Sequence, residues 1–421
     1  MIGSPLVIAE QARARLQAVL TKVREGEDVG LTGLVKPRAA VKTADVVITS
    51  CEVSPAHGTG TLLLRMFPDS SDVISLRTSN FYDGVQAFGA AQYCLPLAHS
   101  TPGEILAWVK WCLAGVSVRR IMVLPYLPAD PLVALAAHEA TGAPLCTYIM
   151  DDKNVCADGI DDAGLLRLLE SSRLRLVISP EMRDAYARKY GMDFFVVPPL
   201  VPESLLKREV VWPPDDIDWS RGVLLGNVWG QRWLDMLRDC FRGTPYSVDW
   251  FCNQERPAGL SFDPAEMAED GVRFNNPVGE AALPQLLARY PFAVVPTDTL
   301  DGHSPPSVQA IAELSLPSRI PTMVAMSHVP VLVIGSPRTS AGQFVLRFGL
   351  GEVVPYERQA IAAALQRLTR RETQEAIRGR AAELAPKLSS EGIADWIWDS
   401  LAKGAPADPR YEGLMAAAAP A

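Results

Sequence analysis

Four polar loops of the sequence have residue types suited to chemistry on a bound ligand. The first, residues 54–61 (SPAHGTGT), follows a short apolar run and opens a helical segment. Gly58 and Gly60 let the backbone approach a ligand closely, and helix amides favour an anion. The His57 imidazole titrates near neutral pH and could act as a general base. We therefore predict His57 as catalytic and Gly58, Thr59 and Gly60 as donor-binding; the alternative is an ordinary tight turn.

Two adjacent carboxylates, Asp151 and Asp152, follow the apolar run 145–150. A carboxylate at the end of a strand can accept the proton of a substrate hydroxyl. Both are therefore predicted as catalytic residues. Because neighbours in sequence point in different directions, we do not expect both to face one site, and the alternative for either is loop capping.

The third loop, residues 226–232 (GNVWGQR), follows an apolar run in the second half of the chain. Its two glycines and its arginine could surround phosphate oxygens at the start of a helix. We predict Gly226, Asn227 and Arg232 as donor-binding residues, in the position topologically equivalent to the His57 loop. The alternative is a structural turn.

The fourth motif is 315–319 (SLPSR). Pro317 suits the first position of a helix and Leu316 is a poor N-cap, so the amides that follow would be left for an anion. The helix dipole and Arg319 would help to hold that anion, and we predict Ser318 and Arg319 as donor-binding residues. The alternative is that Ser318 caps a helix starting near Pro321.

A polar loop after the apolar run 292–295 carries Asp298 and His303, which we also predict to reach the donor. No histidine or cysteine has a partner at metal-ligand spacing, so no metal site is predicted.

Short apolar runs alternate with helical segments on both sides of a proline- and aspartate-rich stretch, which predicts two doubly wound parallel sheets with ligands at their carboxyl edges. Two details argue against a dinucleotide-binding dehydrogenase: Leu63 stands at the third glycine position of the first loop, and Arg77 follows the second apolar run in place of an acidic residue. The predicted divisions are an N-terminal helical extension (1–44), a first Rossmann-like domain (45–205), a linker (206–221), a second Rossmann-like domain (222–385), a C-terminal helix (386–403) and a flexible tail (404–421).

Composition narrows the class of protein. The chain has 421 residues, of which 48% are hydrophobic and 21% charged, and its net charge of −8 opposes nucleic-acid binding. Seven cysteines without a CxxC spacing indicate thiols in a reducing compartment. No signal peptide or membrane span is evident, so we expect a cytoplasmic protein. Residues 7–25 have the spacing of an amphipathic helix, which we expect to pack on the body, with contact to the inner face of the membrane as the alternative.

Taken together, these segments resemble bacterial glycosyltransferases of the GT-B fold, broadly of the family 4 or family 1 type. The resemblance spans about residues 45–401. Its carriers are HGTGT (57–61), TYIMDD (147–152), RLVISPEMRDAYARKYG (175–191), LLGNVWG (224–230), SLPSRI (315–320), VPVLVIG (329–335) and RFGLGEVV (347–354).

The resemblance implies two Rossmann-like domains facing a cleft, with C-terminal helices. It implies a metal-independent hexosyltransferase without a bound cofactor, which moves a sugar from a nucleotide-sugar donor to a hydroxyl of a polysaccharide, glycolipid or small acceptor. Ser318, Arg319 and the Asn227 loop would hold the diphosphate, and the first domain would bind the acceptor.

The sequence departs from the family at one feature. The family has a pair of glutamates separated by seven residues, and Leu314 and Thr322 stand at these two positions here. Two alternatives therefore stay open: a nucleotide-sugar epimerase on the same fold, and a non-catalytic binding protein. The sequence makes no prediction of the oligomeric state.

Overall fold

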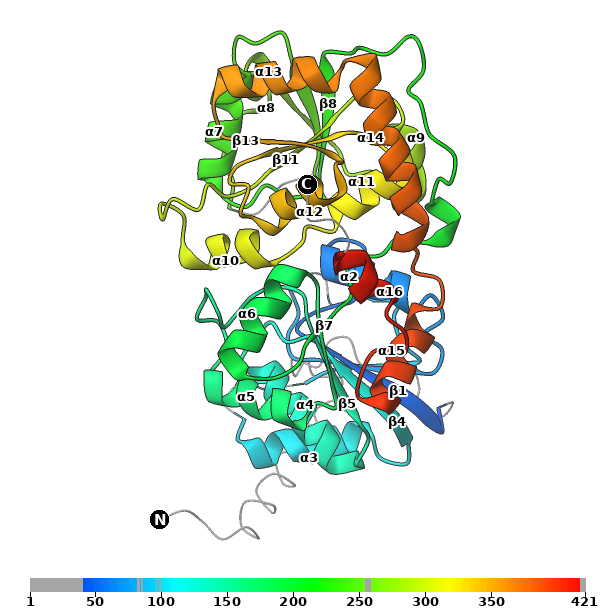
Figure 1. Cartoon of the computed structure of the whole chain (residues 1–421). Helices are drawn as coiled ribbons and strands as arrows, with labels where there is room; N and C mark the ends of the chain where they lie inside the picture. The colour runs from blue at the N-terminus through cyan, green and yellow to red at the C-terminus, as the bar shows by residue number, and fades with distance from the viewer. Residues whose placement is uncertain are drawn as a thin grey trace.

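The structure is a computed structural model that describes residues 41–81, 84, 86–95, 97, 100–253 and 259–416. The amphipathic helix predicted for residues 7–25 lies outside the described residues. The described chain forms two α/β domains stacked one on the other, with α2 at their boundary (Figure 1).

The sheet of the first domain has seven parallel strands in the order β3-β2-β1-β4-β5-β6-β7. Its inner strands are continuous apolar runs because helices cover both faces of the sheet. The strands are β1 (Thr43–Thr49), β2 (Val73–Arg77), β3 (Ala91–Cys94), β4 (Ser117–Val123), β5 (Leu145–Ile149), β6 (Leu174–Val177) and β7 (Phe195–Val196). The helices are α2 (Gly58–Met66), α3 (Pro102–Cys112), α4 (Ala129–Thr141), α5 (Asp162–Ser171) and α6 (Pro180–Tyr190).

The sheet of the second domain has six parallel strands in the order β10-β9-β8-β11-β12-β13, which repeats the order of the first sheet. Strand β8 therefore corresponds to β1, which confirms that the Asn227 and His57 loops are topologically equivalent. The strands are β8 (Arg221–Leu225), β9 (Ser247–Phe251), β10 (Val272–Asn275), β11 (Ala293–Pro296), β12 (Val331–Ile334) and β13 (Gly351–Val354). The helices are α7 (Gln231–Phe241), α8 (Pro264–Glu269), α9 (Leu283–Leu287), α10 (Pro306–Leu314), α11 (Arg319–Ser327), α12 (Ser340–Phe348), α13 (Arg358–Leu368) and α14 (Arg371–Leu384).

Three elements differ from the sequence-based expectation. Strand β3 was not expected, because its four residues include Gln92 and make no apolar run. Helix α8 was missed as well, since only Met267 of its six residues is buried. Pro317, expected at the first position of a helix, lies in the segment 315–318 that separates α10 from α11.

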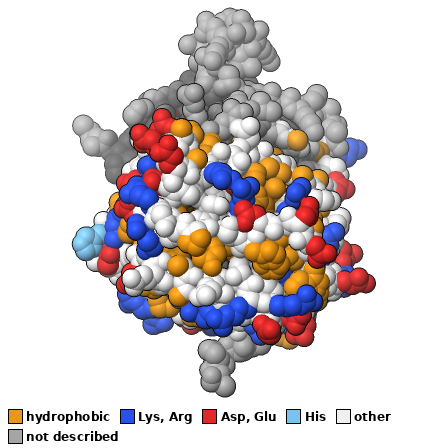
Figure 2. Space-filling view, turned by 90° about the horizontal axis from the view of Figure 1, so that it is seen from above, with side chains coloured by type: hydrophobic (Ala, Val, Ile, Leu, Met, Phe, Trp, Pro, Cys, Tyr) orange, Lys and Arg blue, Asp and Glu red, His pale blue; other side chains and the backbone are white. Residues whose placement is uncertain are grey.

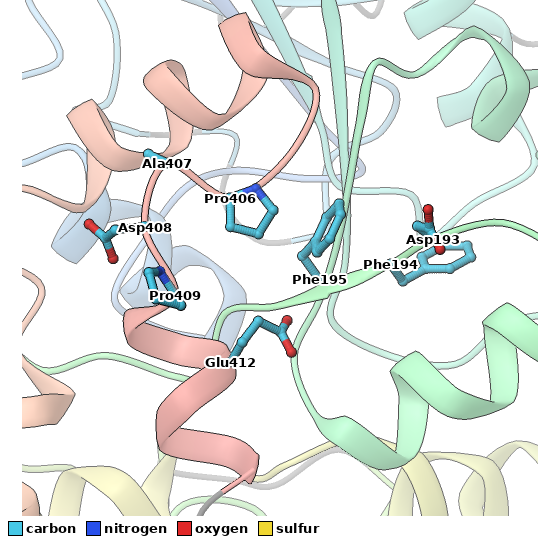
Figure 3. A pocket seen from close by; sticks show the side chains of 8 residues that line it. All are labelled: Asp193, Phe194, Phe195, Pro406, Ala407, Asp408, Pro409 and Glu412. Carbon is cyan, nitrogen blue, oxygen red and sulfur yellow. The ribbon is translucent and has the colours of Figure 1, made fainter.

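The last helices return to the first domain. Trp398 of α15 (Ile393–Lys403) stacks against Phe67 with ring centroids 5.7 Å apart. Glu412 of α16 (Arg410–Ala416) accepts a hydrogen bond from the Val196 amide of β7 (2.8 Å) and pairs with Arg183 of α6 (2.9 Å). Figure 3 shows the Glu412 side chain on the side of α16 that faces the strand carrying Phe195.

The flexible tail predicted from residue 404 onward is therefore wrong for residues 404–416. Tyr411, Leu414 and Met415 have helical spacing and are all buried against the first domain. The run of alanines that follows them concealed this short amphipathic pattern.

Opposite charges are mixed over the outer face of the second domain. Figure 2 shows Lys and Arg side chains among Asp and Glu side chains there, with hydrophobic groups between them. In the described part of the chain, no helix combines the length and the apolar character that crossing a membrane requires.

Close packing of α2 against the loop at Ser54 requires a glycine at position 60. A Cβ atom at this position would lie 2.1 Å from the Ser54 carbonyl oxygen. We expect Gly60→Ala to lower the free energy of unfolding by about 1–3 kcal/mol, because the loop and α2 must move apart. Urea denaturation measures this, and Gly379→Ala is the control, since a Cβ there meets nothing within 4 Å. Equal stability of the Gly60→Ala variant and the wild type would show that this contact is not tight.

We expect His328 to make the stability depend on pH. It is fully buried at the end of α11, where Nδ1 accepts from the Val211 amide (3.0 Å) and Nε2 donates to the Lys207 carbonyl (2.9 Å). Burial lowers its pKa to about 4. Because the folded pKa lies below the unfolded one, the contribution is complete above about pH 6.5 and decreases as the pH falls toward 4.

We expect the wild type to lose about 2 kcal/mol of unfolding free energy between pH 7 and pH 5 through this residue. His328→Asn should show a correspondingly smaller loss, and asparagine tolerates the positive φ of 57° found here. Urea titrations of both proteins at the two pH values measure the difference. If the wild type and His328→Asn lose the same unfolding free energy between the two pH values, groups other than His328 cause the pH dependence.

Candidate active site

Two helix N-termini meet at the boundary between the domains. The Ser318 Oγ lies 3.5 Å from the position that a Cβ would take at Gly58, the first residue of α2. Ser318 itself immediately precedes α11. Helix α2 follows the carboxyl end of β1, and α11 follows α10 after a short break, so the first turns of both helices lie at this boundary.

The start of α11 corrects one prediction. The helix begins at Arg319, so Pro317 precedes it instead of occupying its first position. Ser318 is at the N-cap position, but its side chain makes no capping hydrogen bond, and the alternative of a serine cap for a helix starting near Pro321 is wrong as well. The Ser318 side chain is therefore not used to cap α11.

Arg319 joins α11 to the loop after β8. Its Nη1 donates to the carbonyl oxygens of Leu225 (3.0 Å) and Asn227 (2.6 Å). Burial lowers its pKa to about 10, so the guanidinium stays charged at neutral pH. Among the described residues, its Nε and Nη2 make no hydrogen bond. One edge of the guanidinium therefore fixes the loop, while the other is available to an anion.

Gly226 makes this contact possible. Its φ of 77° lies in the left-handed region that favours glycine, and Arg319 atoms lie 3.8 Å from the position of a Cβ there. The Asn253 Oδ1 is 3.9 Å from the same position. The predicted residues Gly226, Asn227 and Arg319 thus form one cluster.

Asp151 lies at the same boundary, half-buried after β5. Burial raises its pKa, while Lys153, Ser315 and Tyr126 act in the opposite direction. The Tyr126 hydroxyl shares a hydrogen bond with Thr59 Oγ1 (2.6 Å), which brings the predicted Thr59 close to the carboxylate. Residues of both domains therefore surround Asp151, because Ser315 belongs to the second domain.

Ser315 is a neighbour that the sequence did not single out. Its side chain is buried next to Asp151 but outside hydrogen-bond geometry, and its Oγ has no partner among the described residues. A buried hydroxyl normally finds a partner, so an unpartnered one at this boundary is unusual. Ser315 could not have been identified from spacing alone, since domain packing brings it to Asp151, whereas Tyr126 follows β4, the strand beside β5 in the same sheet.

Asp152 does not have the catalytic role predicted for it. Its side chain is fully buried and accepts hydrogen bonds from the amides of Asn154 (3.0 Å), Val155 (2.9 Å) and Cys156 (2.7 Å). The Tyr186 hydroxyl adds a fourth at 2.7 Å. These four hydrogen bonds occupy the Asp152 carboxylate, which therefore caps the loop.

His57 caps α2 instead of facing a substrate. Its Nδ1 accepts from the Gly60 amide (3.2 Å), and its Nε2 donates to the Glu52 carbonyl (2.6 Å). Burial lowers its pKa, so the neutral ring fits this arrangement. Because both nitrogens bond to the backbone, the general-base role predicted for His57 is wrong in this conformation. The role of Gly60 is likewise explained by packing against Ser54.

The loop 298–304 is held by its own contacts. Asp298 is fully buried and accepts from Trp233 Nε1 (3.1 Å) and from the Leu300 amide (2.6 Å), so its predicted donor contact is not supported. Arg232 pairs with Asp301 (2.7 Å), and the exposed His303 lies beside the same carboxylate (3.1 Å). In the described structure, no hydrogen bond connects this loop with Ser318 or Arg319.

Thr322, one of the two positions at which the sequence lacks the expected glutamate, is bonded to Arg65 of α2. The Arg65 guanidinium is buried, pairs with Glu280 (2.5 Å) and donates to the Leu200 carbonyl (2.7 Å). It also donates to Thr322 Oγ1 of α11 (3.2 Å). Thr322 therefore faces the first domain, where it helps to fix the two helices that begin at the site. A lone arginine within the apolar run LLLRM is the signal that sequence reasoning missed.

The site does not coincide with the hollow drawn in Figure 3, which measures about 410 Å³ and lies between β7 and α16. Three acidic residues, Asp193, Asp408 and Glu412, line this hollow. Within the described ranges, no group of three or more His, Cys, Asp or Glu side chains is placed to hold a metal ion.

No protein family and no curated protein matches the sequence in these comparisons. Solved structures do match the fold over most of the chain. HepE from Anabaena, in complex with UDP, has a TM-score of 0.57 at 14% identity, covering 85% of this chain and 100% of that one.

Two further structures are similar to the chain. Trehalose-6-phosphate synthase, OtsA, has a TM-score of 0.57 at 10% identity and covers 86% of this chain and 100% of its own. The lipopolysaccharide outer core galactosyltransferase WaaB, in its apo form, has a TM-score of 0.53 at 12% identity, with 85% and 99% covered. With two parallel sheets of equal strand order and facing carboxyl edges, the chain has the GT-B fold.

Proposed function

We propose that the chain is a metal-independent glycosyltransferase that moves a hexose from a nucleotide-sugar donor to a hydroxyl acceptor. One observation carries the proposal: two helix N-termini, the free edge of Arg319 and the Asp151 carboxylate converge at the boundary of the two domains. A polysaccharide or glycolipid as acceptor would place the enzyme in the cytoplasm or at the inner face of the membrane.

The donor diphosphate would bind at the start of α11. Arg319 and the amides of that turn offer positive charge to the phosphate oxygens, and Ser318 and the 226–227 loop lie beside them. As the bond between the sugar carbon and the diphosphate oxygen breaks, negative charge grows on the leaving group. Charge already fixed in place stabilises that state without a metal ion or a bound cofactor.

The acceptor would approach from the first domain. Its hydroxyl oxygen forms the new bond to the sugar carbon, and Asp151 takes the proton that the hydroxyl loses. The raised pKa of Asp151 suits it to this role, because a more basic carboxylate is the better proton acceptor. The structures of HepE in complex with UDP and with UDP-glucose support the donor class by likeness of fold.

The test is a calorimetric titration with UDP, GDP, ADP, CMP and their sugar conjugates, with NAD as the control ligand. We expect one nucleotide sugar to bind selectively. Binding of NAD alone, or of no nucleotide in the panel, would contradict the proposal.

A further inference from the structure

A second cavity, of about 640 Å³, lies where the end of the second domain meets α16. Its walls come from α12, α14, the short helix η4 (Ala385–Leu388) and α16. Figure 1 shows α16 at the boundary of the two domains. The volume is in the range of small-molecule sites.

The cavity is basic, although the chain as a whole carries a net charge of −8. Four cationic side chains and one carboxylate, Glu383, line it. Two of the cations are already neutralised: Arg347 pairs with Glu181 (3.0 Å) and Arg410 with Asp408 (2.6 Å).

The other two cations are Arg380 and Lys387. Arg380 uses its Nε to donate to the Gly349 carbonyl (2.7 Å), which leaves its terminal nitrogens for other partners. Neither side chain forms an ion pair with any described residue. A positive potential therefore remains at this end of the cavity.

The remaining wall is apolar. Leu346 is 41% exposed, although it is a large hydrophobic residue, and Phe348 is half-buried next to it. Leu414 of α16 completes this side. A ligand with both an anionic and an apolar part would match the cavity better than a simple ion.

We propose that this cavity binds a phosphate-bearing molecule with an apolar portion, with the phosphate on Arg380 and Lys387 and the apolar portion on Leu346 and Phe348. Arginine offers a fork of donors to phosphate oxygens and lysine a point charge. Because α16 packs on the first domain while α12 and α14 belong to the second, the ligand contacts both domains. The site is separate from the proposed donor site and does not depend on its function.

The test uses hexyl phosphate and inorganic phosphate as calorimetric probes. We expect hexyl phosphate to bind about tenfold or more tightly than inorganic phosphate, because several methylene groups are buried. Arg380→Glu/Lys387→Glu should weaken hexyl phosphate binding by about tenfold or more. Lys110→Glu/Arg273→Glu reverses two exposed charges elsewhere and should leave it unchanged.

Two further arms identify the source of the phosphate and the location of binding. Cosedimentation with phosphatidylcholine vesicles, with and without phosphatidic acid, shows whether a lipid headgroup is captured; hexyl phosphate binding without vesicle binding assigns a soluble ester. Arg319→Met should retain the binding, since the domain-boundary site is not involved. Absence of binding to both probes and to the vesicles, or binding that the cavity variant does not weaken, would overturn the proposal.

Discussion

Replacing Arg319 by methionine should weaken the binding of the selected nucleoside diphosphate roughly 10- to 150-fold, the usual range for losing a hydrogen bond to a charged group. The substitution keeps an unbranched side chain but removes the guanidinium that joins the start of α11 to the carbonyl oxygens of Leu225 and Asn227. Calorimetry measures the affinity, and thermal unfolding verifies that the variant is folded.

Two variants control this result. Arg319→Lys keeps the charge but loses the fork, so we expect an intermediate affinity. Arg232→Met removes an arginine that pairs with Asp301 and should change the affinity less than Arg319→Met. An equal loss of affinity in Arg319→Met and Arg232→Met would show that Arg319 has no special role in donor binding.

The second large effect concerns Asp151. Asp151→Asn should lower turnover roughly 10²- to 10⁴-fold, as expected for loss of a general base, while donor affinity changes little. The raised pKa of Asp151 also predicts that the acid limb of wild-type activity lies at higher pH than for an ordinary carboxyl, because the base must be ionised. Steady-state rates across pH together with donor titrations measure both expectations.

Asp152→Asn is the matched control, since it alters the neighbouring carboxylate. We expect it to lower stability, because three backbone amides and the Tyr186 hydroxyl depend on that carboxylate. The turnover per folded molecule should stay near that of the wild type. A loss of donor affinity equal to the loss of turnover in Asp151→Asn would assign Asp151 a structural role instead.

The fold was readily predictable because parallel sheets need continuous apolar strands between helices, and both halves of the chain show this alternation. The alternation also predicts facing carboxyl edges and the equivalence of the loops after β1 and β8. Strand β3 was missed because Gln92 interrupts its apolar residues, and helix α16 because the run of alanines after it concealed its short amphipathic pattern. Their stability comes from tertiary contacts such as that of Glu412 with Val196.

The site was predicted only in part. Arg319, Asn227 and Gly226 came together as expected: the turn after β8 places Gly226 and Asn227 at the sheet edge, and Arg319 reaches the same loop from the start of α11. His57 and Asp152 were assigned wrongly, since residue type does not show whether a side chain is already used by backbone amides. The place of Ser315 depends on the packing of one domain against the other, which local sequence does not encode, and that of Tyr126 on the pairing of β4 with β5.

In the proposed reaction, this site breaks the bond between sugar and diphosphate. The most direct measurement is product analysis by mass spectrometry after incubating the chain with the nucleotide sugar selected by titration, with and without candidate hydroxyl acceptors. We expect nucleoside diphosphate together with a glycoside, or with free sugar when only water is present, and little of either from Asp151→Asn. Recovery of the nucleotide sugar unchanged by the wild type, or as its isomer, would contradict the proposed reaction and indicate a binding protein or an epimerase.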